Sequence, residues 1–144
     1  IAIAGARDAV ARAKALAEKR GAKRVLDLPV SAPFHCELMR PAAEGLKRIL
    51  SEVEIRPFSL GVITNVEAEL NLEHGRVKSL LVEQAVRPVR WEESVRKLDA
   101  LGCRRALEIG PGKALKGLIK RIVLQMEVDN FEAPQDLARV KKEG

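Results

Sequence analysis

Apolar runs of strand length alternate with helical patterns along this chain from residue 60 onward. The strand-like runs occur at residues 60–63, 105–109 and 126–128. The spacing of apolar side chains predicts helices between and after them, at residues 75–86, 92–101, 113–124 and 133–142. Because parallel strands need a long crossover connection, usually a helix, this alternation predicts an α/β fold with a parallel sheet.

The first fifty residues predict a different arrangement. Apolar runs at 1–4 and 24–28 are interpreted as strands, with an Ala-rich helix between them over 8–20. Strand, helix and strand in this order are close to half of a small α+β sandwich. A further amphipathic helix is predicted over 38–50, with Pro41 in its first turn, where a missing N–H costs little.

The charge balance favours an anionic partner without naming one. The 144 residues include 26 Lys and Arg against 20 Asp and Glu, which gives a formal net charge of +6. Aromatic residues make up only 3% and Tyr is absent, so the stacking surfaces of single-strand and RNA binders are missing. We therefore expect no nucleic-acid partner.

Cysteine spacing and hydropathy point to the cytoplasm. Cys36 and Cys103 lie far apart with no C-x-x-C spacing, which argues against a disulfide framework or a zinc site. No apolar run of about 18 residues and no leader pattern is present, so we expect neither a membrane span nor secretion. The first residue, Ile1, indicates a chain that has been cut rather than one that starts here.

His35 is the main candidate for a reactive side chain. It lies in a loop between an expected strand and an expected helix, where α/β proteins place reactive groups. Imidazole can take and return a proton near neutral pH, although a lone loop histidine is more often a surface residue. Cys36 follows it, but neighbours in an extended chain point to opposite sides, so we expect no cysteine–histidine pair. His74 stands in a polar loop and is interpreted as a solvated residue.

The sequence Gly110-Pro111-Gly112 follows an expected strand and precedes an expected helix, as a phosphate loop would. The spacing does not fit, because the next glycine is Gly117 and no Ser or Thr follows Lys113. We therefore interpret this segment as a tight turn rather than a nucleotide site.

Four segments, in the same order, resemble malonyl-CoA:acyl carrier protein transacylases. They are PVSAPFHCELMRPA at 29–42, VITNV at 62–66, QAVRPVRW at 84–91 and EIGPGKAL at 108–115. The resemblance implies that residues 31–144 form the C-terminal part of an α/β-hydrolase-like core with a parallel sheet. It also implies that residues 1–30 are the end of a small ferredoxin-like subdomain inserted in that core.

The implied activity is transfer of a malonyl group from coenzyme A to the phosphopantetheine thiol of acyl carrier protein, in fatty-acid synthesis. His35 would be the general base and acid. Gln84, by itself an ordinary polar helix residue, would accept the other ring N–H through its backbone carbonyl or its side chain and so fix the tautomer. No cofactor is implied, because the coenzyme A thioester is a substrate, and the complete enzyme is expected to be a monomer.

The nucleophile that such a reaction needs is missing from these residues. A serine of this kind stands in a Gly-x-Ser-x-Gly turn, and no serine here has flanking glycines. The resemblance therefore implies an upstream serine, arginine and glutamine segment. A parallel sheet without its central strands exposes its edges, so we expect the 144 residues alone to be poorly folded and inactive.

A basic helix face is the candidate docking surface. Lys113, Lys116 and Lys120 fall on one side of the expected helix, with Arg121 beside them. This face is either simply solvated or a dock for an acidic carrier protein.

Three further interpretations follow. Phe34 matches the residue that in this family accompanies malonyl rather than methylmalonyl choice. Trp91, the one tryptophan, is interpreted as a core residue. The alternatives to a fatty-acid enzyme are a polyketide-type acyltransferase domain and a basic binding module without catalysis.

Overall fold

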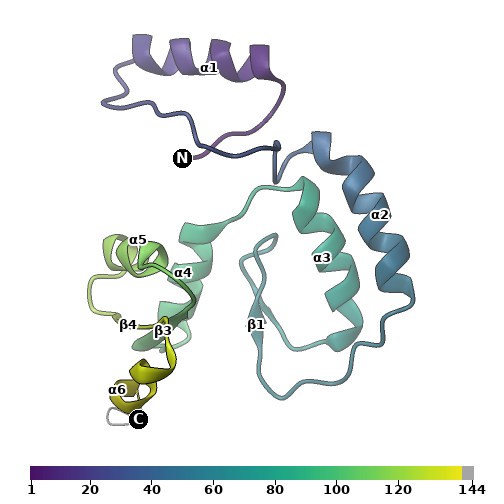
Figure 1. Ribbon diagram of the computed structural model, residues 1–144, viewed down its shortest axis with the longest axis vertical. Coiled ribbons are helices and arrows are strands. Elements are labelled where there is room, and N and C mark those ends of the chain that lie inside the picture. Colours follow the sequence, from purple (N-terminus) through teal and green to yellow (C-terminus); the bar gives the residue numbers. More distant parts are fainter. Residues whose placement is uncertain (141–144) are drawn as a thin grey trace. The chain divides into compact units, whose positions relative to one another are not determined.

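The computed structural model describes residues 1–140 (Figure 1). The chain divides into two compact units, and each is described by itself. The first unit comprises residues 1–61 and 71–89, and the second comprises residues 62–70 and those from 90 onward. The boundary expected after residue 30 rests on resemblance rather than on contacts, and it stays a prediction.

The first unit is helical. Its helices are α1 (Arg7–Lys19), α2 (Arg40–Ser51) and α3 (Val77–Val86), and α2 and α3 pack together (Figure 1). Short 3₁₀ turns at Glu37–Met39 and His74–Arg76 precede α2 and α3. As predicted, proline stands in the first turn of α2 and α3 ends before Pro88, because the residue preceding proline avoids helical backbone angles.

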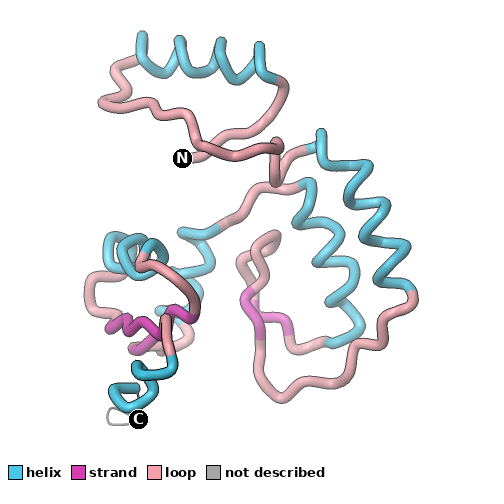
Figure 2. The backbone as a smooth tube through the Cα atoms, in the orientation of Figure 1, coloured by secondary structure: helices cyan, strands magenta, loops and turns pink. Residues whose placement is uncertain are grey.

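The strands predicted at 1–4 and 24–28 do not form. Both segments are loops in Figure 2, and Leu26 and Leu28 are 63% and 61% exposed. A strand needs a neighbour to receive its backbone hydrogen bonds, and no segment of the described chain pairs with either run. Apolar side chains alone therefore did not specify strands here. The helix between them is confirmed, although none of the residues of α1 is buried.

The second unit contains the predicted parallel pair. Strands β3 (Arg105–Ile109) and β4 (Glu127–Phe131) run parallel, with Arg105 opposite Glu127 and Ile109 opposite Phe131. Helix α5 (Ala114–Ile122) connects them, and α4 (Trp91–Ala100) packs against α5. This strand–helix–strand crossover confirms the α/β class that the alternation predicts.

The remaining elements are short. Strands β1 (Val62–Ile63) and β2 (Leu70–Asn71) form a second small sheet, so the strand predicted over 60–63 is only partly present. Helix α6 (Leu137–Val140) follows a 3₁₀ turn, and the predicted continuation to residue 142 lies outside the described residues. No helix in residues 1–140 is long and apolar enough to cross a bilayer.

The second unit has a core of its own. Its buried residues are Val95, Ile119, Val123, Met126 and Val128. Trp91 packs against them, which confirms its interpretation as a core residue. Full burial of such side chains contributes about 1.5–3 kcal/mol each, so this cluster fixes α4 and α5 on the β3–β4 pair.

Candidate active site

His35 lies in a turn, not in an extended segment as the sequence interpretation assumed. Its φ is 60°, in the left-handed region, where histidine is found more often than most residues with a side chain. The Cys36 thiol donates to the Pro33 carbonyl at 3.1 Å, and the Phe34 N–H donates to the Ala32 carbonyl at 2.9 Å. The partner of Cys36 is therefore a carbonyl, and the expectation that it does not pair with His35 agrees with this contact.

The structure brings His35 and Gln84 together within the first unit. Nδ1 of His35 lies 2.7 Å from the backbone carbonyl oxygen of Gln84. Because a carbonyl only accepts hydrogen bonds, Nδ1 must donate, which leaves Nε2 of a neutral ring as the acceptor. Of the two possibilities left open by the sequence, the backbone carbonyl makes the contact.

The local sequence explains why this carbonyl points outward from α3. In a continuing helix, the Gln84 carbonyl would accept from the N–H of residue 88. Residue 88 is proline and has no N–H. Pro88 therefore ends α3 and also removes the helical partner of the carbonyl that His35 uses. This proline was the sequence signal that could have identified the backbone carbonyl.

Two further polar residues are His74 and Asn65. His74 is exposed in its 3₁₀ turn, as predicted. The backbone carbonyl of Asn65, just after β1, accepts the Arg90 backbone N–H at 2.9 Å inside the second unit. The Arg90 guanidinium bonds to Glu93 at 2.6 and 2.9 Å and lowers the pKa of that carboxyl, while Glu93 raises the pKa of Arg90. These contacts join the β1 loop to the start of α4.

The Gly-Pro-Gly segment is a tight turn held by two side chains that the sequence reasoning did not identify. Gly110 and Gly112 have φ of 132° and 88°, angles that favour glycine. The Glu108 carboxylate accepts the Leu115 and Lys116 N–H groups at 3.0 and 2.9 Å.

The second of these side chains is buried. Asn130, only 2% exposed, donates to the Gly112 carbonyl at 2.9 Å and to the Glu108 carbonyl at 3.3 Å. The first-turn N–H groups that a phosphate would need are thus already bonded to Glu108. This agrees with the interpretation as a turn.

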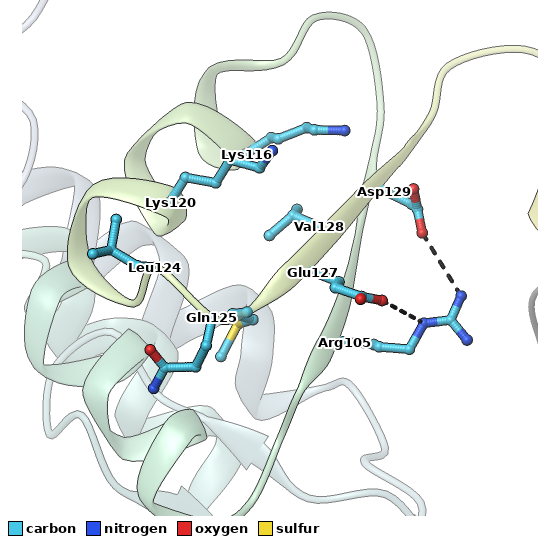
Figure 3. A pocket seen from close by; sticks show the side chains of 9 residues that line it. Arg105, Lys116, Lys120, Leu124, Gln125, Glu127, Val128 and Asp129 are labelled. Atoms are coloured by element: carbon cyan, nitrogen blue, oxygen red, sulfur yellow. Dashed lines mark ion pairs between the residues drawn. The ribbon is translucent and has the colours of Figure 1, made fainter.

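The basic residues of α5 are only partly gathered. Lys116 and Lys120 line a surface cleft of about 580 Å³ together with Leu124 and Val128 (Figure 3). Across the cleft, Arg105 pairs with Glu127 and Asp129 of β4 at 3.7 and 3.8 Å. Lys113, which precedes α5, and Arg121 do not line this cleft.

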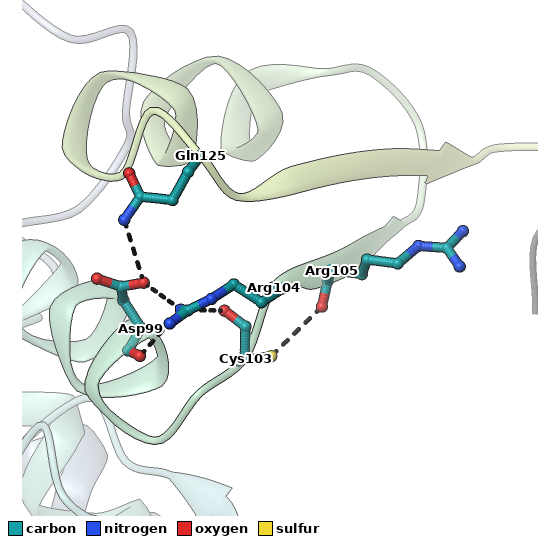
Figure 4. A network of polar contacts seen from close by, with 5 residues as sticks. All are labelled: Asp99, Cys103, Arg104, Arg105 and Gln125. Carbon is teal, nitrogen blue, oxygen red and sulfur yellow. Dashed lines mark hydrogen bonds and ion pairs between the residues drawn. The ribbon is translucent and has the colours of Figure 1, made fainter.

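The polar network around Asp99 has a structural role. The Asp99 carboxylate accepts from Arg104 at 2.6 Å and from Gln125 at 3.5 Å, and the Cys103 thiol donates to the Arg105 carbonyl at 3.3 Å (Figure 4). It fixes the turn between α4 and β3. Both cysteines are free thiols, and in residues 1–140 no group of three or more His, Cys, Asp or Glu could hold a metal.

The comparisons with known proteins decide the kinship. The malonyl CoA-acyl carrier protein transacylase of Bacillus subtilis strain 168 is 43% identical over 137 residues, which is 95% of this chain. That of Escherichia coli K12 is 39% identical over 138 residues, which is 96% of the chain. This chain is homologous to a portion of the malonyl CoA-acyl carrier protein transacylases. No family model matches the sequence.

Solved transacylase structures agree with this kinship and with the fold class. The acyl carrier protein S-malonyltransferase of Vibrio cholerae O1 has a TM-score of 0.89 at 43% identity, covering 94% of this chain and 44% of that one. A malonyl-transacylase solved in complex with its type II polyketide acyl-carrier protein has a TM-score of 0.91 at 36% identity, covering 97% and 45%. The chain therefore spans less than half the length of the transacylases it matches.

Proposed function

We propose that this chain supplies the histidine of an [acyl-carrier-protein] S-malonyltransferase that acts in fatty-acid synthesis in the cytoplasm. The observation that carries the proposal is the 2.7 Å contact between Nδ1 of His35 and the Gln84 carbonyl, in a chain 43% identical to a transacylase over nearly its whole length. This contact gives the ring the tautomer of a general base, with Nε2 ready to take a proton.

The reaction would proceed by acyl transfer in two halves. A serine outside these residues gives its proton to Nε2 of His35 and attacks the malonyl thioester carbonyl. The imidazolium then protonates the departing coenzyme A thiolate, and the malonyl group stays on the serine. In the second half, His35 takes the proton of the phosphopantetheine thiol, which attacks the acyl-serine, and returns that proton to the serine oxygen. No cofactor enters either half.

The basic surface on α5 is the proposed dock for the carrier protein. Lys116 and Lys120 stand beside the apolar side chains of Leu124 and Val128 at the cleft, a combination that suits an acidic, amphipathic partner. Lys113, at the start of α5, and Arg121, in its last turn, would add to the positive field of this helix. One structural relative is solved in complex with an acyl-carrier protein, which supports the partner class and leaves the docking residues as a proposal.

Malonyl transfer by the full-length protein tests the proposal. Radiolabelled malonyl-CoA should label the protein covalently, and label should pass to added carrier protein. His35→Ala should lower the transfer rate by about 10²–10⁴-fold, the usual contribution of general acid–base catalysis. His74→Ala is the matched control, because His74 is exposed and lies outside the site, and it should keep the full rate. An unchanged rate in His35→Ala would remove His35 from the mechanism.

Two alternatives remain open to the same assay. Because one relative is solved with a type II polyketide carrier protein, the assay should compare a polyketide carrier protein with a fatty-acid one as malonyl acceptors. A higher kcat/KM with the polyketide carrier protein would assign the enzyme to polyketide synthesis. A basic binding module would show no acylation and would bind RNA in a strongly salt-dependent manner.

A further inference from the structure

The turn around His35 holds a backbone conformation that its side chain disfavours. A left-handed φ brings the Cβ of a residue other than glycine close to its following carbonyl oxygen. His35 has a φ of 60° and is exposed, so packing around the ring does not impose this angle. Such conformations persist when the surrounding contacts hold them.

Two hydrogen bonds hold the left-handed backbone conformation of His35. On one side, the partly buried Cys36 thiol reaches back across His35 to the Pro33 carbonyl at 3.1 Å, and proline fixes the φ at the start of the turn. On the other side, the ring itself bonds to Gln84 of α3 at 2.7 Å. After Cys36 the backbone is extended, with φ −144° and ψ 171°, and enters the 3₁₀ turn at Glu37–Met39.

We propose that Cys36 is a positioning residue for His35. Its thiol closes the turn from Pro33 to Cys36 and so keeps the imidazole where Nδ1 meets the Gln84 carbonyl. The thiol does not react and does not touch the substrate in this role. The kinetic consequence rests on the proposed function, since it assumes that His35 is the general base, whereas the structural consequence for the ring does not.

A pair of substitutions separates the hydrogen bond from the packing. Cys36→Val keeps a side chain of similar volume and removes the donor, whereas Cys36→Ser keeps a donor and reduces the volume. In the full-length protein, Cys36→Val should lower kcat per titrated acyl-enzyme site by about threefold to tenfold, the effect of one net hydrogen bond. The KM for malonyl-CoA should not change. Cys36→Ser should stay within about twofold of the parent.

Cys103→Val is the matched control. It removes the same kind of thiol-to-carbonyl bond, here 3.3 Å to Arg105, in the other unit, and it should leave kcat unchanged. Equal kcat for Cys36→Val and the parent would overturn the proposal. Equal losses for Cys36→Val and Cys36→Ser would also overturn it, because volume rather than the hydrogen bond would then be responsible.

A spectroscopic readout makes the test independent of activity. Nitrogen-15 chemical shifts of the His35 ring, assigned by their loss in His35→Gln, report which nitrogen carries the proton. The parent should show the proton on Nδ1, and Cys36→Val should show a mixture of tautomers. If the parent transfers no malonyl, the proposed function fails while these shifts still decide the role of Cys36. Unchanged shifts in Cys36→Val would refute it.

Discussion

The segment before α2 and the β3–α5–β4 crossover have similar apolar patterns but reach different structures. Residues 1–4 and 24–28 have the composition of strands and remain loops, whereas 105–109 and 127–131 form a parallel pair. The difference is that β3 and β4 pair with each other and are joined by α5, which packs on β4. An apolar run therefore becomes a strand only when the chain also places a hydrogen-bonding partner beside it.

The same contrast appears in the side chains. Leu16 of α1 is 53% exposed, while Met126, just before β4, is 2% exposed. Of these two regions only the crossover contains buried apolar residues, so it gains more hydrophobic stabilisation than the segment before α2. The apolar side chains of α1 also recur at helical spacing, but no surface in residues 1–140 buries them.

The largest expected effect, and the strongest test of this difference in burial, comes from truncating one side chain in each region. Met126→Ala removes a fully packed side chain and should lower the free energy of unfolding of the full-length protein by about 2–5 kcal/mol, because it leaves a cavity. Leu16→Ala, in a half-exposed position, should lower it by less than about 1 kcal/mol. Urea unfolding followed by circular dichroism measures both. Equal losses of unfolding free energy would show that α1 is buried in solution to the same degree as the crossover.

Local rules predicted those features that depend on neighbours in sequence. The bounds of β3 agree with the predicted 105–109, α3 ends before Pro88 as proline requires, and Gly102 has the left-handed φ, 84°, expected after a helix. The transacylase kinship was also visible in the order of four short segments, because motif spacing is a property of the sequence itself.

The features that were missed depend on contacts across space. The Glu108 carboxylate accepts from N–H groups seven and eight positions later in the chain, and Asn130 donates to a carbonyl 18 positions earlier. Neither contact follows from a periodic pattern. The left-handed backbone of His35 was missed for another reason, since that conformation is normally expected of glycine or asparagine and here depends on a thiol and a carbonyl.

Two Gly→Ala substitutions in the crossover, five positions apart, should have smaller and opposite effects on stability. At Gly112 the φ is 88°, and an added Cβ would meet no atom within 4 Å, so Gly112→Ala should cost about 1 kcal/mol from backbone strain alone. Gly117 lies inside α5 with equally open space. Gly117→Ala should therefore stabilise by about 0.4–1 kcal/mol, since alanine restricts the unfolded chain and favours helix. Urea midpoints that move in the same direction would show that one of these backbone environments differs in solution.

The smallest expected effect is a pair of carboxyl titrations, one in each unit. Hydrogen bonds from Arg12 and Arg90 lower the pKa of Asp8 and of Glu93 below their ordinary values of 3.8 and 4.5. A lowered carboxyl pKa stabilises the fold above the ordinary value, and this contribution disappears as the pH falls through the lowered one. Both groups are exposed, so the contributions are small and should weaken in 1 M salt.

Carboxyl carbon shifts measured against pH in the full-length protein give both midpoints, with Arg12→Gln and Arg90→Gln as controls that should raise the Asp8 and Glu93 midpoints respectively. If α1 forms in solution, Asp8 and Glu93 should both titrate low. If α1 unfolds for lack of a covering surface, Asp8 alone should return to its ordinary pKa, because the bond between Asp8 and Arg12 spans one helical turn at 2.9 Å. The Glu93 midpoint stays low in either case, since Arg90 is also held by the Glu67 carbonyl at 2.8 Å. The difference between the two midpoints therefore measures whether the N-terminal segment keeps its helix without the neighbours that the crossover has.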